Sequence, residues 1–167
     1  TAGNASQITD GAAALLVMTE ARAEELGMEP LGRLVDYQWS GCDPARMGLG
    51  PAFAMAELTR RTGWKPDSAD LGEINEAFAA QVLAVLSAVK GGKGAATAGL
   101  DSTPGEIPEE ILNVNGGAIA LGHPVGVSGA RLVLTALKEL GRRDAHRALI
   151  SMCIGGGQGG AAWLERP

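Results

Sequence analysis

Two residues of this chain have the type and the surroundings that acid–base chemistry requires. His123 is one of two histidines in the chain, and it stands in the glycine-rich run NGGAIALGHPVGVSGAR at positions 115–131. Cys153 belongs to the apolar run RALISMCI, which leads into the glycine-rich link GGGQGG. A neutral imidazole can act as a base or a hydrogen-bond donor, and a thiol can carry protons or acyl groups. The glycines beside both residues predict room for a substrate near them.

Each of the two residues also has a purely structural interpretation. A lone histidine can fix a loop through hydrogen bonds, and a free cysteine on a strand is usually a small core hydrophobe. Against this, His123 lies just before an expected helix, and Cys153 lies at the carboxyl end of an expected strand, where α/β sheets present their chemistry. Because closeness in sequence does not establish closeness in space, the residues alone leave both roles open.

The glycine-rich stretches do not fit nucleotide binding. GGGQGG at positions 155–160 satisfies the G-x-G-x-x-G string, but a dinucleotide site also needs a helix directly after the glycines, and AAWLE reads as a strand. GGKGAAT at positions 91–97 lacks the Lys-Ser/Thr ending of a phosphate-binding loop. We therefore expect these glycines to allow close backbone approach, with N–H groups that can bind an oxyanion.

The rest of the sequence predicts the strands that must position these residues. Short apolar runs alternate with helix-like segments, which is typical of an α/β layer on a largely parallel sheet. The tight link GGGQGG predicts that the last strand turns back antiparallel to its predecessor. The expected strands are residues 12–18, 31–39, 70–74, 147–154 and 161–165.

The helices are predicted from capping residues and periodicity. Thr19 is an expected N-cap, and Ser128 is the expected cap of a helix with one apolar side. Asn75 opens a segment that is apolar nearly all round, which predicts a helix buried between layers. Residues 90–110 hold many glycines and prolines without periodicity, and we expect an exposed inserted loop there. The expected helices are residues 20–26, 51–63, 76–90 and 129–141.

Composition and charge disfavour several classes of function. A length of 167 residues, with 46% hydrophobic and 20% charged residues, is typical of one soluble domain without a membrane span. The formal charge of −5 argues against a nucleic-acid partner. Two cysteines are too few for a disulfide framework, so we expect a reducing, cytoplasmic setting. The chain begins without a methionine, which predicts a processed or truncated piece of a longer protein.

Three motifs in chain order carry a resemblance to a known enzyme family. They are NEAF at positions 75–78, NGGAIALGHPVGVSGAR at 115–131 and CIGGGQGG at 153–160, preceded by TAGNASQITDGAAALLVM and MGLGP. Over nearly its whole length the chain resembles the C-terminal half of a thiolase, that is, an acetyl-CoA acetyltransferase or 3-ketoacyl-CoA thiolase. The resemblance implies a five-layered αβαβα fold of two similar halves, each a mixed five-stranded sheet with helices on both faces. This single domain, residues 1–167, is expected to be one such half.

The resemblance also implies a role for each matching residue. His123 resembles the base that activates a nucleophilic cysteine and helps to stabilise the thioester oxyanion. Cys153 resembles the second cysteine, which moves the proton at the α-carbon of an acyl-CoA. Asn75 resembles the residue that holds a water in one oxyanion hole, and the backbone N–H of Gly155 resembles a donor in the other. The wall that contacts the pantetheine arm of coenzyme A is expected at Ser6, Ala77 and Phe78.

The implied reaction is acyl transfer to or from coenzyme A, by Claisen condensation or thiolytic cleavage, as in lipid metabolism and fatty-acid β-oxidation. Coenzyme A is then a substrate, and no permanent cofactor or metal is expected. Neither cysteine matches the family's nucleophile, and Cys42 is expected to be structural. The chain is thus expected to be inactive alone and to need an N-terminal thiolase half as its partner. The expected substrates are acetoacetyl-CoA or another acyl-CoA, and coenzyme A. The full protein is expected to be a homodimer or tetramer.

Two alternatives stay open. A β-ketoacyl synthase or hydroxymethylglutaryl-CoA synthase shares the fold and a catalytic histidine, although those relatives use a different residue where Cys153 stands. A lone half-domain that binds coenzyme A or dimerises without catalysis is the second alternative. It predicts binding without turnover even when the missing half is supplied.

Overall fold

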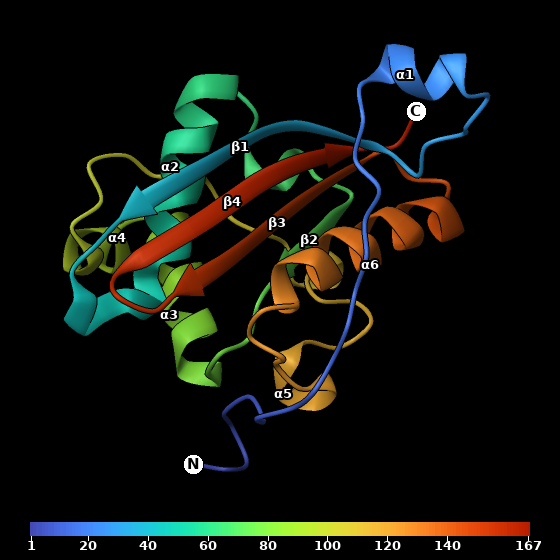
Figure 1. The fold of residues 1–167 in the computed structure, drawn as a ribbon. Helices are drawn as coiled ribbons and strands as arrows, with labels where there is room; N and C mark the ends of the chain where they lie inside the picture. Colours follow the sequence, from blue (N-terminus) through green and yellow to red (C-terminus); the bar gives the residue numbers. More distant parts are fainter.

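A four-stranded mixed sheet forms the centre of the computed structural model, which describes residues 1–167 (Figure 1). The sheet order is β1-β4-β3-β2, in which β2 and β3 run parallel and β4 is antiparallel to both β1 and β3. The strands are β1 Arg33–Gly41, β2 Leu71–Ile74, β3 Arg147–Ile154 and β4 Gln158–Glu165. The prediction that the last strand returns antiparallel through the glycine link is confirmed.

The first of the five predicted strands does not join the sheet. Residues 12–18 have no strand partner, and Leu16 and Val17 are 75% and 82% exposed. The sheet therefore has four strands rather than five, and a single parallel pair rather than a mostly parallel order. An apolar run becomes a strand only where a neighbour takes up its backbone N–H and C=O groups, and no neighbour within this chain does so.

Helices cover both faces of the sheet, which confirms the predicted α/β class (Figure 1). On one face α2 and α3 pack, with α4 against α3, and on the other face α6 packs on β2 and β3. None of the helices has the length and apolar character that a bilayer crossing demands. The helices are α1 Glu20–Glu25, α2 Gly50–Thr62, α3 Ala79–Lys90, α4 Lys93–Ala98, α5 Ala118–Leu121 and α6 Ser128–Arg143.

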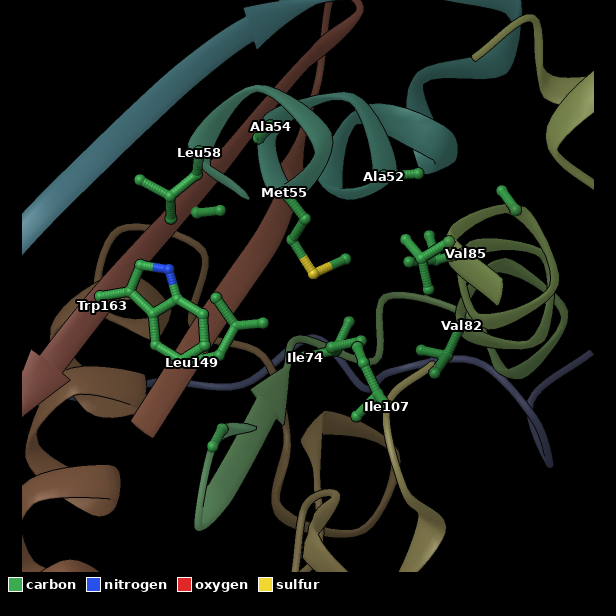
Figure 2. Close-up of a cluster of buried hydrophobic side chains, with 14 residues drawn as sticks. Ala52, Ala54, Met55, Leu58, Ile74, Val82, Val85, Ile107, Leu149 and Trp163 are labelled. Carbon is green, nitrogen blue, oxygen red and sulfur yellow. The ribbon is translucent and has the colours of Figure 1, made fainter. Parts of the chain in front are cut away.

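Alternation along β3 and β4 divides the core into two clusters, because successive strand residues point to opposite faces. Leu149 and Trp163 lie among the side chains of α2 and α3 (Figure 2). Their neighbours Ile150 and Leu164 face α6 and pack with Leu132. Strands β2, β3 and β4 are therefore buried on both faces, which holds the carboxyl ends of β2 and β3 in fixed positions.

The helix-capping predictions are only partly correct. Thr19 caps α1, because its Oγ1 accepts a hydrogen bond of 3.3 Å from the Arg22 N–H. Asn75 does not open α3, which begins four residues later at Ala79. Ser128 is the first residue inside α6 rather than its cap, and its hydroxyl bonds elsewhere.

Two predictions about exposure are also wrong. The helix α3 is not enclosed between layers, since Leu83 is 67% exposed on its outer side. Residues 90–110 are not a plain exposed loop, because they include α4 and bury Ala95 and Ile107. Ile107 belongs to the core beside α3, so apolar contacts hold the segment in place. Its many glycines and prolines gave no sign of these contacts in the sequence. Whether it is an insertion relative to the family stays a prediction.

Candidate active site

Asn75 and Cys153 lie at the same edge of the sheet. Asn75 directly follows β2, and its backbone N–H donates to the carbonyl of Ser151 on β3 over 2.9 Å. Cys153 stands two residues further along β3, near its carboxyl end. Because β2 and β3 are parallel, their carboxyl ends meet at one edge, which is where α/β sheets bind ligands.

His123 reaches this edge with both ring nitrogens in contact with side chains. Its Nδ1 lies 2.5 Å from the Oγ of Ser128, and its Nε2 lies 3.3 Å from the Nδ2 of Asn75. The Ser128 hydroxyl donates to the carbonyl of Pro124 over 3.2 Å, so its oxygen is free to accept from Nδ1–H. An amide Nδ2 can only donate, so Nε2 carries the lone pair. The contacts thus select the neutral tautomer with a basic Nε2.

Burial and charge adjust the proton affinities of the two candidate residues in complementary ways. Burial, together with the nearby cation of Arg131, lowers the pKa of His123, so the imidazole is neutral at physiological pH. Burial raises the pKa of the Cys153 thiol, whose residue is 6% exposed. A neutral base and a protonated thiol are the states that proton transfer to and from a carbon acid requires.

Glycine is needed directly before His123 for two reasons. Gly122 has φ of +94°, a conformation that L side chains rarely adopt. A Cβ at that position would also lie 2.5 Å from the Cγ2 of Thr9. The loop is further held by the His123 N–H, which donates to the carbonyl of Gln7 over 3.1 Å. The N-terminal segment therefore sets where the imidazole stands.

The three residues predicted as a coenzyme A wall lie together. The Ser6 N–H donates to the carbonyl of Ala77 over 2.9 Å, and Ala5 pairs with Phe78 in an isolated antiparallel bridge. Phe78 is 46% exposed, so its ring offers an apolar surface to a ligand. The structure thus brings Ser6, Ala77 and Phe78 to one place, and their role in binding stays a prediction.

The sequence analysis missed Glu76 and Asn113, which hold the loop before His123. Asn113 Nδ2 donates to Glu76 Oε1 over 3.0 Å, and the Ile119 N–H donates to Glu76 Oε2 over 3.1 Å. A Cβ at Gly117 would lie 2.1 Å from the Glu76 carboxyl carbon. Both residues stand in motifs that the sequence shows, NEAF and NGG, but the need for glycine opposite this carboxylate follows only from their contact in space.

The glycine link after β3 forms a tight turn. Gly156 and Gly157 have φ of +85° and +88°, and a Cβ at Gly157 would lie 2.4 Å from the carbonyl oxygen of Cys42. Gly155 is exposed at the same end of β3 as Cys153. No hydrogen bond joins Gly155 or Cys153 to His123, so their joint action is a prediction rather than an observed contact.

The oxyanion role predicted for Asn75 has one supporting observation. Its side chain is fully buried, and while Nδ2 contacts His123, its Oδ1 is buried without a hydrogen-bond partner. A buried polar atom without a partner is costly, and such atoms mark sites that a water or ligand completes.

The comparisons with known proteins decide the family. Residues 28–166 match the family model described as "Thiolase, C-terminal domain". The chain belongs to the thiolase C-terminal domain family. The relatives include acetyl-CoA acetyltransferases of Thiocystis violacea and Cupriavidus necator, each 48% identical over 99% of this chain and 38% of the relative. The thiolase domain therefore spans about 38% of the length of the curated relatives that it matches.

Solved structures agree with this assignment. The acetyl-CoA acetyltransferase of Bacillus anthracis superposes on the thiolase domain with a TM-score of 0.84 and 43% identity, over 100% of this chain and 38% of the other. The human mitochondrial 3-ketoacyl-CoA thiolase in complex with CoA gives a TM-score of 0.84 and 42% identity over the same shares. The expected resemblance to a thiolase is thus confirmed.

Cys42 of the thiolase domain has the surroundings of a structural thiol. Its Sγ lies 3.9 Å from the carbonyl oxygen of Arg46 and 4.0 Å from that of Met47. Burial, and then the negative charge of Asp43, raise its pKa, which disfavours the thiolate that a nucleophile needs. These contacts agree with the expectation that Cys42 is not the nucleophile of the family.

Proposed function

We propose that the protein containing this thiolase domain is an acetyl-CoA acetyltransferase or 3-ketoacyl-CoA thiolase. The observation that carries the proposal is the position of His123, held between Ser128 and Asn75 with a basic Nε2. This base stands at the edge of the sheet where Cys153 lies near the carboxyl end of β3, in a chain 48% identical to acetyl-CoA acetyltransferases. Base, thiol and oxyanion donors are the groups that acyl transfer through a thioester requires.

In the proposed cleavage direction, the Nε2 of His123 takes the proton of a cysteine thiol supplied by the N-terminal half. The resulting thiolate attacks the 3-keto carbon of the substrate, the bond between the α-carbon and that carbon breaks, and an acyl-enzyme forms. The enolate of acetyl-CoA that leaves takes a proton from the Cys153 thiol and becomes acetyl-CoA. The thiol of coenzyme A then gives its proton to the Cys153 thiolate and takes up the acyl group, and the released enzyme cysteine takes its proton back from His123. Condensation is the same sequence reversed.

The chain's own groups supply the stabilisation that these steps need. Developing negative charge on a thioester oxygen is stabilised by fixed donors, and the Gly155 N–H and a water held by Asn75 are proposed for this role. The raised pKa of Cys153 keeps its proton available for the enolate carbon. The lowered pKa of His123 keeps the ring neutral, so the lone pair on Nε2 can accept the proton of the nucleophile in place of the Asn75 amide hydrogen.

The proposed partner is an N-terminal thiolase half, and the α6 face of the sheet supports it. Beside α6 an open apolar cavity of about 480 Å³ is bordered by strand β1 and by α6. Tyr37 and Trp39 are 53% and 61% exposed there, and large exposed apolar patches mark interaction surfaces. The part of the relatives that this chain does not match is the proposed source of the cover, since this chain spans 38% of their length.

Coenzyme A is the proposed second substrate, rather than a bound cofactor. The contact of Ser6 with Ala77, beside the exposed ring of Phe78, offers a surface for its pantetheine arm. A related thiolase has been solved in complex with CoA. A cytoplasmic homodimer or tetramer that acts in lipid metabolism, including fatty-acid β-oxidation, completes the proposal.

The test is thiolysis of acetoacetyl-CoA by the full-length protein, followed by a series of longer 3-ketoacyl-CoA substrates. His123→Ala is expected to abolish turnover, and Cys153→Ala to lower kcat by about a hundredfold or more, since each removes a proton-transfer group. Unchanged rates in both variants would refute the roles. Binding of coenzyme A by the wild-type protein without any turnover would favour a non-catalytic module.

A further inference from the structure

Glu73 and Arg131 form an ion pair beside the base, in which Glu73 is buried and Arg131 is partly exposed. Arg131 Nη1 lies 3.2 Å from Glu73 Oε2, and the two side chains are 21% and 3% exposed. Glutamate and arginine are rarely so buried unless they are paired. A buried pair gains little stability over packed apolar residues, because both charges lose their hydration. The pair therefore calls for a role beyond stability.

The ion pair repeats the geometry that holds His123. Glu73 on β2 contacts Arg131 of α6, and Asn75, two residues further along the chain, contacts His123 in the loop before α6. Ser128 and Arg131 are three residues apart on α6 and share a face. Asn75 and Ser128 contact the two ring nitrogens of His123. Glu73, two residues before Asn75, and Arg131, three residues after Ser128, contact each other and so link β2 to α6.

The charged groups around this contact come from both elements. Glu73 and Glu76 come from β2 and the turn after it, and Arg131 and Glu139 come from α6. Burial raises the pKa of Glu73 to about 7 although Arg131 opposes the change, so below that pH this carboxyl is largely protonated. The cation of Arg131 is then not cancelled by a full negative charge on its partner.

We propose that Arg131 is a positioning residue for His123, held in place by the buried carboxyl of Glu73. The inference rests on the proposed thiolase function, in which Nε2 of His123 is the base. Arg131 ties the first turn of α6 to β2, so Ser128 and Asn75 keep their distances to the imidazole. Its positive charge also disfavours a second proton on the ring. No atom of the substrate needs to touch Arg131.

The test uses the full-length protein and compares Arg131→Met, Arg131→Lys and Glu73→Gln with a matched control, Arg61→Met. Arg61 pairs with Asp36 at the outer strand of the sheet, in an ion pair of 2.7 Å that has no part in the site. Exchange of the imidazole C2 hydrogen, followed by mass spectrometry, measures the pKa of His123 without any need for turnover. The acid limb of the kcat/KM profile for thiolysis reports the same group during catalysis.

Arg131→Met is expected to raise the pKa of His123 and to move the acid limb to higher pH by the same amount. Because small misplacements of a base are costly, kcat should fall about 10- to 100-fold while KM stays within about twofold. Arg131→Lys keeps the cation and should keep the pKa of His123. Glu73→Gln matches a protonated carboxyl in shape and charge, so it too should leave that pKa in place, as should the control.

An unchanged pKa of His123 in folded Arg131→Met would overturn the proposal, even if activity fell, because a merely structural role lowers activity without moving that pKa. If Arg131→Met does not fold, Glu73→Gln/Arg131→Gln provides the same test with two amides that can bond to each other without a buried charge. If Arg131→Met raises the pKa of His123 but the full-length wild-type protein shows no thiolysis, the proposed function is refuted and the positioning role is retained.

Discussion

The buried carboxyl of Glu73 makes the stability of this domain depend on pH in a way that one substitution should remove. Burial raises its pKa from 4.5 to about 7, despite the opposing cation of Arg131. Between these two values the folded chain binds more protons than the unfolded chain, so the free energy of unfolding falls as pH rises. At 1.36 kcal/mol per tenfold change in proton affinity, the full loss is about 3 kcal/mol and is complete above about pH 8.

Glu73→Gln replaces this carboxyl with an amide that has no proton to lose. We expect the variant to match the wild type below about pH 4.5 and to be more stable by about 3 kcal/mol above pH 8. Urea unfolding of the 167-residue chain at a series of pH values, followed by circular dichroism, measures the difference. Glu57→Gln is the control, since Glu57 lies on the surface of α2 and pairs with Arg60. If the free energy of unfolding differs between wild type and Glu73→Gln by the same amount at every pH, the reasoning is refuted.

Three further predictions test the frame of the site and the core. Ser128→Ala removes the oxygen that accepts from Nδ1–H of the histidine, and it should lower kcat of the full-length protein about tenfold at unchanged KM in steady-state kinetics. Gly122→Ala should lower the free energy of unfolding by about 1 to 2 kcal/mol or more, because its φ is positive and its Cβ meets a side chain, whereas Gly126→Ala, in open space, should cost far less in the same thermal unfolding assay. Leu149→Ala should cost about 2 to 5 kcal/mol in urea unfolding, and Leu83→Ala, on the exposed side of α3, should stay within about 0.5 kcal/mol; equal losses would contradict the assigned core.

The parts of the fold that follow from local chemistry were predicted well. Pro51 and Gly63 bound α2, since proline suits the first turn of a helix and glycine takes the left-handed conformation at its end. The runs that became β3 and β4 are continuous apolar segments separated by a glycine turn, and both strands formed. These features depend on residues near one another in sequence, and sequence alone can show them.

Most of the wrong predictions concern contacts with distant partners. Residues 12–18 have strand-like composition, but a strand needs a neighbour, and no other segment of the chain supplies one. Asn75 and Ser128 have side chains suited to capping, yet the structure uses both to hold His123. Their competition between a local cap and a tertiary hydrogen bond is decided by which partner lies within reach.

The sequence by itself predicted which residues would carry the chemistry: a histidine in GHP, a cysteine in CIGGGQGG and an asparagine in NEAF. Only the tertiary structure decided the protonation state and the tautomer of the histidine. Asn75 and His123 are 48 residues apart, and their contact, with that of Ser128, leaves the lone pair on Nε2. Burial of the ring, together with the nearby cation of Arg131, then keeps the ring neutral. Proton affinity depends on distances between groups and on their burial, and those exist only after β2 and α6 have packed.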